Sequence, residues 1–72
     1  MITFEPLISE CPPDLEGASR LLMKVIINAK KGGLGPFTLD KIAKYTDLNL
    51  VDVSEAINEL AKRELIHVEG WV

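Results

Sequence analysis

The stretch TDLNLVDVSEAINEL, residues 46–60, contains the pattern that best identifies the fold of this chain. Its apolar residues recur at spacings of three and four, which predicts a helix with one inward face. The inward positions are Val53, Ile57, Leu60 and, beyond the stretch, Ala61. Asn49 stands just before the pattern and is a residue type that caps helix N-termini, so we expect the helix over residues 50–64.

A shorter helix is predicted directly before this one, over LDKIAKYT, residues 39–46. Thr38 can cap its start, and Asp40 in the first turn is favoured by the helix dipole. Ile42 is placed on its inward face. Asp47 follows and tolerates the left-handed backbone conformation that a turn needs. The sequence thus predicts two helices joined by a tight turn.

The longest predicted helix comes earlier in the chain, over residues 14–31. Its inward stripe is Leu15, Ala18, Leu22, Val25 and Ala29. The double glycine at residues 32–33 stops the pattern. Leu21, Met23 and Ile27 lie elsewhere on the circumference, so we expect them to form the interface of a homodimer. The alternative cover for this face is the N-terminal segment, folded back over it.

The two ends of the chain are expected to carry the β structure. Residues 65–68 read as a short strand, followed by a turn at residues 69–70 and the start of another strand. Residues 1–13 are predicted to be an N-terminal arm or strand ahead of a domain over residues 14–72. Their first part fits a short edge strand that could pair with residues 65–68, and a helical or disordered arm is equally allowed.

Composition limits the function classes. The 72 residues make one small domain, 47% of them hydrophobic, with a formal net charge of −3. Cys11 is the one cysteine and cannot form an internal disulfide, and no apolar run is long enough to span a membrane, so we expect a cytoplasmic location. Cys11 and the one histidine, His67, do not by themselves make a metal site. No serine has a base at usable spacing, so we expect no metal, no cofactor and no enzymatic activity.

With these elements in order, IAKYTDLNLVDVSEAINELAKRELI, residues 42–66, resembles the signature of winged helix-turn-helix domains. The matching positions are Ile42 and Ala43 in the first helix of the motif, Asp47, Leu48 and Asn49 in the turn, Val53 and Ser54 in the second helix, and Glu64, Leu65 and Ile66 at the entry to the wing. The resemblance covers about residues 14–72 and implies a mainly α fold of three helices with a short antiparallel sheet as a β-wing. It also implies a small DNA-binding protein that regulates transcription.

Charge departs from the pattern of that family. Residues 1–17 carry four acids and no base, residues 18–39 carry four bases and no acid, and residues 40–72 carry seven acids and four bases. Glu55 stands where many members of the family have an arginine that contacts bases, and the short segment after Ile66 has no basic tip. The predicted third helix is therefore acidic where phosphate-lined DNA would favour cations.

Two functions from different classes follow. In the first, the chain binds double-stranded DNA, with lysines and a helix N-terminus on the phosphate backbone and the third helix on base edges. The residues assigned to this contact are Lys30, Lys31, Thr38, Lys41, Lys44, Ser54, Glu55 and Asn58. In the second, the chain is a non-catalytic protein-interaction module whose acidic third helix docks on a basic protein partner. The family resemblance favours the first function, and the charge favours the second.

Overall fold

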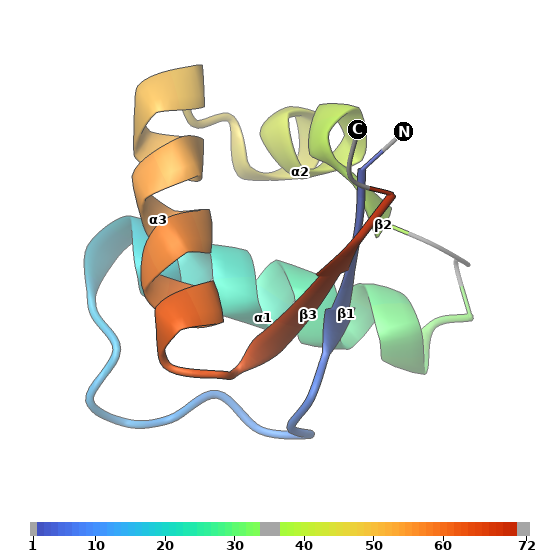
Figure 1. Cartoon of the computed structure of the whole chain (residues 1–72), viewed down its shortest axis with the longest axis vertical. Helices are drawn as coiled ribbons and strands as arrows, with labels where there is room; N and C mark the ends of the chain where they lie inside the picture. Colours follow the sequence, from blue (N-terminus) through green and yellow to red (C-terminus); the bar gives the residue numbers. More distant parts are fainter. Residues whose placement is uncertain (1, 34–36, 71–72) are drawn as a thin grey trace.

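The computed structural model of the protein describes residues 2–33 and 37–70. Over these residues it contains three helices and one short antiparallel sheet of three strands (Figure 1). In chain order the elements are β1 (Thr3–Pro6), α1 (Gly17–Lys31), β2 (Phe37–Thr38), α2 (Leu39–Thr46), α3 (Leu50–Lys62) and β3 (Ile66–Glu69). The predicted mainly α fold with a small sheet is confirmed, and its layout is that of a winged helix. In the described part of the chain, no helix is both long enough and apolar enough to cross a membrane.

Helix α2 begins and ends at the predicted residues because both ends are fixed locally. At its start, the Thr38 hydroxyl accepts a hydrogen bond from the Lys41 backbone N–H at 3.3 Å. At its end, Asp47 adopts the left-handed conformation with φ of 56° and donates its backbone N–H to the Ala43 carbonyl at 3.0 Å. Residues 47–49 then form the turn that leads into α3.

Helix α3 begins where predicted and ends two residues early. The Asn49 side-chain oxygen accepts the Asp52 backbone N–H at 2.9 Å, which is the expected N-cap. The predicted end at residue 64 is wrong because Glu64 adopts a left-handed conformation, with φ of 58°, and turns the chain out of the helix. The Leu65 backbone N–H then bonds back to the Leu60 carbonyl at 2.9 Å, and the chain enters β3.

Helix α1 begins at Gly17, three residues later than predicted. The residue before it, Glu16, is extended, with φ of −134° and ψ of 160°, so the helix cannot reach back to residue 14. Leu15 is buried all the same, because a turn in which its N–H bonds to the Pro12 carbonyl at 3.3 Å directs it to the core. At the other end, the helix stops at Lys31 as predicted.

The sheet has the strand order β2-β1-β3, with β1 antiparallel to both neighbours. Phe4 lies opposite Phe37 on one side and Val68 on the other. Of the alternatives that the sequence leaves open for the N-terminal segment, pairing with the strand near residues 65–68 is the one observed, and that strand, β3, is shifted by one residue to Ile66–Glu69. The expectation of an edge strand is wrong, because β1 is the central strand. Of the two alternatives for residues 1–13, an arm or a strand, the structure has a strand at Thr3–Pro6, and the further strand predicted after residue 70 lies outside the described residues.

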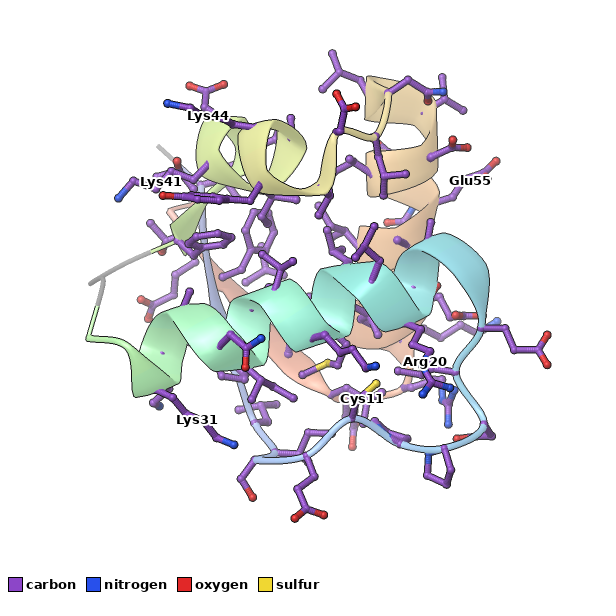
Figure 2. All side chains as sticks on the ribbon, turned by 180° about the vertical axis from the view of Figure 1, so that it is seen from behind. Cys11, Arg20, Lys31, Lys41, Lys44 and Glu55 are labelled. Atoms are coloured by element: carbon purple, nitrogen blue, oxygen red, sulfur yellow. The ribbon has the colours of Figure 1, made fainter. Side chains whose placement is uncertain are left out.

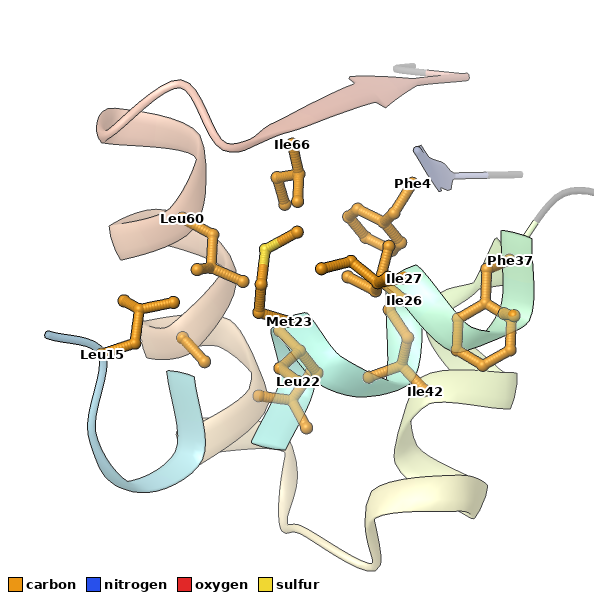
Figure 3. Close-up of a cluster of buried hydrophobic side chains, with 13 residues drawn as sticks. Phe4, Leu15, Leu22, Met23, Ile26, Ile27, Phe37, Ile42, Leu60 and Ile66 are labelled. Atoms are coloured by element: carbon orange, nitrogen blue, oxygen red, sulfur yellow. The ribbon is translucent and has the colours of Figure 1, made fainter. Parts of the chain in front are cut away.

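The core lies between the three helices and the sheet. Met23 is fully buried and Ile27 is 5% exposed. Figure 3 shows Met23 pointing toward Ile66 of β3 and Ile27 lying beside Phe4 of β1. The prediction that Met23 and Ile27 face a second copy of the chain is therefore wrong, because the N-terminal strand and β3 cover that side of α1. Leu21 alone of the three predicted interface residues is exposed, at 40%.

Candidate nucleic-acid interface

The outer face of α3 is open to solvent. Val53, Ala56 and Leu60 are buried against the core, which fixes how the helix is turned. The opposite side carries Ser54, Glu55, Asn58 and Glu59, and all four are exposed. Glu55 points away from the body of the molecule (Figure 2). The positions that the sequence assigned to base edges, Ser54, Glu55 and Asn58, thus share one exposed surface.

The first turn of α3 adds an apolar end to that surface. Leu50 is 63% exposed and Val51 is 67% exposed, immediately after the capping residue Asn49. Leu50 was not among the residues selected from the sequence. Helical periodicity alone would place it inward, because Leu50 lies three positions before Val53 and seven before Ile57, which is the spacing of residues that share one face.

Helix α2 contributes two cations near this motif. Lys41 and Lys44 are exposed, and both lie at the same end of the molecule (Figure 2). Thr38 is half-buried, and its hydroxyl oxygen is used as the helix cap. Its O–H remains a donor, since a hydroxyl can donate and accept at once. Glu55 lies at the opposite edge of the same view, so α2 and α3 present cations and acids on different sides.

The other two residues assigned to DNA contact, Lys30 and Lys31, do not lie on α2 or α3. Lys30 and Lys31 end α1, and this end of the helix is the one far from α3 (Figure 1). The Lys30 ammonium lies 3.8 Å from the Glu5 carboxylate of β1. Both groups are mostly exposed, so this ion pair contributes little to stability. Six of the eight predicted residues thus lie on the helix-turn-helix, in two separate groups: Thr38, Lys41 and Lys44 at α2, and Ser54, Glu55 and Asn58 on α3.

The electrostatics of α3 are unfavourable for phosphate contact. Residues 50–62 carry three acids, Asp52, Glu55 and Glu59, against the single base Lys62. Arg63 follows, but its guanidinium donates to the Asp14 carboxylate at 2.7 Å and so ties the end of α3 to the segment before α1. The cations of this motif that are in no ion pair among the described residues are therefore Lys41 and Lys44 on α2 and Lys62 in the last turn of α3.

The strands at the position of the wing are equally poor in cations. Neither β1 nor β3 contains a lysine or an arginine. The His67 imidazole lies 3.3 Å from the Glu69 carboxylate on β3. Any contact with a nucleic acid by this end of the sheet would lack the charge that a basic wing supplies.

A scan against models of known protein families, a search of curated proteins and a search of solved structures each found no match.

Proposed function

We propose that this chain is a small winged-helix DNA-binding protein of the transcriptional-regulator type, acting in the cytoplasm. One observation carries the proposal: α2 and α3 are joined by the three-residue turn 47–49, and α3 presents its Ser54, Glu55 and Asn58 side to solvent. Two helices joined by a turn of this length are the helix-turn-helix arrangement, whose second helix enters the major groove.

The residues divide into two roles in this proposal. Lys41, Lys44 and the N-terminal end of α2 at Thr38 contact phosphates, which position the protein without reading sequence. Asn58 can make a bidentate pair with adenine, and Ser54 can donate or accept at several base edges. Glu55 accepts a hydrogen bond from the exocyclic amine of cytosine, which makes one acid in the groove compatible with base recognition.

The affinity of such a complex decreases as the salt concentration rises. Each neutralised phosphate contributes about 0.9 to the negative slope of log affinity against log salt, so two lysines give a slope of about −1.8. Binding is therefore weak at physiological salt and is best measured at low salt. Fluorescence anisotropy with a labelled duplex of mixed sequence measures this slope directly.

The decisive variant is the double substitution Lys41→Glu with Lys44→Glu. We expect it to weaken duplex binding and to flatten the salt slope. The matched control is Lys30→Glu with Lys31→Glu, which makes the same change in charge at the end of α1 away from α3. Equal loss in both double variants, or no binding of the wild type to any duplex at low salt, would overturn the proposal.

A second candidate function is favoured by a separate observation. Leu50 and Val51 expose apolar surface beside Glu55 and Glu59, and exposed apolar groups with adjacent acids suit a basic, partly apolar protein partner. In this case the chain is a non-catalytic protein-interaction module. Glu55→Lys separates the two candidates, because it tightens non-specific binding to DNA and weakens binding to a basic protein.

A homodimer is part of the DNA-binding proposal, since helix-turn-helix dimers commonly bind two half-sites at a fixed spacing. Met23 and Ile27 are buried and are not available for it, so Leu21 is what remains of the predicted interface on the surface. Sedimentation equilibrium of the free protein and of its duplex complex measures the stoichiometry. One copy of the chain in each would end the dimer proposal.

A further inference from the structure

Helix α3 opens with two exposed apolar side chains that its own domain does not use. Val51 and Leu50, at 67% and 63%, are the most exposed large apolar side chains in the described part of the chain. The Asn49 cap fixes the start of the helix just before them. Val53, two residues on, supplies the first core contact of α3 and is fully buried. The start of the helix therefore fixes the positions of Leu50 and Val51, while their side chains remain mostly exposed to solvent.

These residues continue into the polar surface of the same helix. Val51, Glu55 and Asn58 are separated by four and three positions, which places them along one line of the helix surface. Glu55 is exposed and directed away from the core (Figure 2). Along this line α3 presents methyl groups, then a carboxylate, then a carboxamide.

Each of these groups has a distinct complement in the major groove. Thymine presents its 5-methyl group there, which apolar side chains contact. Cytosine presents the N4 amine, a donor that a carboxylate accepts, whereas guanine presents only acceptors, which repel a carboxylate. Adenine presents a donor beside an acceptor, which suits a carboxamide such as that of Asn58.

We propose that α3 selects duplexes in which thymine lies against Leu50 and Val51 and cytosine lies against Glu55. This inference rests on the proposed DNA-binding function and adds its sequence preference. Specificity then comes largely from repulsion. The carboxylates of Glu55 and Glu59 lower the affinity for every duplex that does not present a hydrogen-bond donor to them in the major groove. The low number of cations near α3 keeps non-specific binding weak and makes this penalty effective.

The expected preferences are measurable as ratios of affinity. Leaving a buried carboxylate without its donor lowers affinity by roughly ten- to 100-fold, which is the range for hydrogen bonds to charged groups. Burying one methyl group changes affinity by about fourfold. The position read by Glu55 should therefore be selected more strongly than the positions read by Leu50 and Val51.

The first experiment is selection from a pool of randomised duplexes with the full chain, followed by selection with Glu55→Gln. We expect the wild type to enrich a cytosine that Glu55→Gln replaces by adenine, because a carboxamide pairs with adenine in the groove. Glu10→Gln is the matched control, since Glu10 is an exposed acid in the segment before α1 and should leave the selected sequence unchanged. Thermal unfolding of each variant establishes that it is folded as the wild type is.

The second experiment replaces the selected thymines by deoxyuridine, which removes only the 5-methyl group. The wild type should lose affinity about fourfold per contacted methyl, and Leu50→Ala with Val51→Ala should lose sensitivity to this replacement. A wild type that enriches no sequence and binds no duplex would overturn the DNA-binding function itself. A wild type that enriches a sequence unaffected by Glu55→Gln, or that tolerates deoxyuridine fully, would overturn this inference and leave DNA binding in place.

Discussion

Helices α1 and α3 are both richer in apolar residues than one inward face requires, and the structure treats the two excesses differently. On α1 two of the three residues beyond the expected stripe, Met23 and Ile27, are buried, and Leu21 is 40% exposed. On α3 the residues beyond the stripe, Leu50 and Val51, are exposed. The difference lies in what is packed against each helix. α1 contacts α2, α3 and β1, whereas α3 packs on α1, with smaller contacts to α2 and β3.

A surplus of apolar residues on a helix therefore does not by itself indicate a binding partner. For α1 the cover is β1, which comes from the N-terminal end of the chain and places Phe4 in the core. No comparable segment covers the first turn of α3 among the described residues. Most of the surplus on α1 therefore belongs to the core of the domain, whereas Leu50 and Val51 on α3 remain on the surface.

The largest effect is expected from Met23→Glu. A carboxylate placed at this fully buried position would have no partner and would leave a poorly filled core, at a cost of about 4 kcal/mol or more. That cost is close to the whole stability of a small domain, so the variant should be unfolded at room temperature. Circular dichroism and its thermal melting curve measure this.

Leu21→Glu is the matched control for this prediction, since it introduces the same acidic residue two positions away on the same helix. Leu21 is 40% exposed, so its variant should melt close to the wild type. If Leu21→Glu unfolds the protein as Met23→Glu does, the exposed side of α1 is covered in solution. The contrast between α1, covered by its own chain, and α3 would then be wrong for α1.

The second effect tests the cover itself. Phe4→Ala removes the buried side chain that β1 places against α1, and such truncations cost about 3–5 kcal/mol. Urea unfolding followed by circular dichroism gives the change. Glu5→Ala, the exposed neighbour on the same strand, should change stability by less than about 0.5 kcal/mol. A Phe4→Ala variant as stable as Glu5→Ala would mean that β1 does not cover α1.

The features that sequence predicted well are those that short-range chemistry fixes. The ends of α2 and the start of α3 depend on Thr38, Asp47 and Asn49, each of which acts within four residues of its own position. The exposure of Ser54, Glu55 and Asn58 follows equally from helical periodicity around the buried Val53 and Leu60. These sets of residues could therefore be named before the structure was known.

The features that sequence predicted poorly depend on contacts between distant parts of the chain. The burial of Met23 and Ile27 depends on strands from both ends of the chain, where Phe4 pairs with Val68. The position of Lys30 away from α3 depends on the direction in which α1 crosses the molecule. Periodicity identifies which residues share a side of a helix, but it does not identify the element that comes to lie against that side.

A third and smaller effect is expected at the turn between α2 and α3. Asn49→Ala removes the side-chain oxygen that accepts the Asp52 N–H at 2.9 Å. Loss of an N-cap costs about 1 kcal/mol. Because the cap also fixes where α3 begins, the variant should weaken duplex binding more than its stability loss explains. Amide hydrogen exchange would locate the change, with faster exchange in the first turn of α3 and unchanged exchange in α1.

The smallest effect on stability is expected from Leu50→Ala combined with Val51→Ala. Both side chains are more than half exposed, so truncating them removes little buried surface, and alanine is a better helix former than valine. We expect the free energy of unfolding, measured in urea, to change by less than about 0.5 kcal/mol. Val53→Ala is the matched control in the same helix and should cost about 2 kcal/mol, since its side chain is fully buried.

The outcome of this pair decides whether the first turn of α3 is a free surface. If the alanines at positions 50 and 51 cost as much as Val53→Ala, these side chains are packed in solution, and α3 has no apolar end to offer a base or a partner. If they cost nothing in stability and lower duplex affinity, Leu50 and Val51 are held for contact with another molecule. Unfolding and duplex binding measured on the same preparation separate these two results. Truncating a residue that serves only in binding lowers the duplex affinity and leaves the free energy of unfolding unchanged.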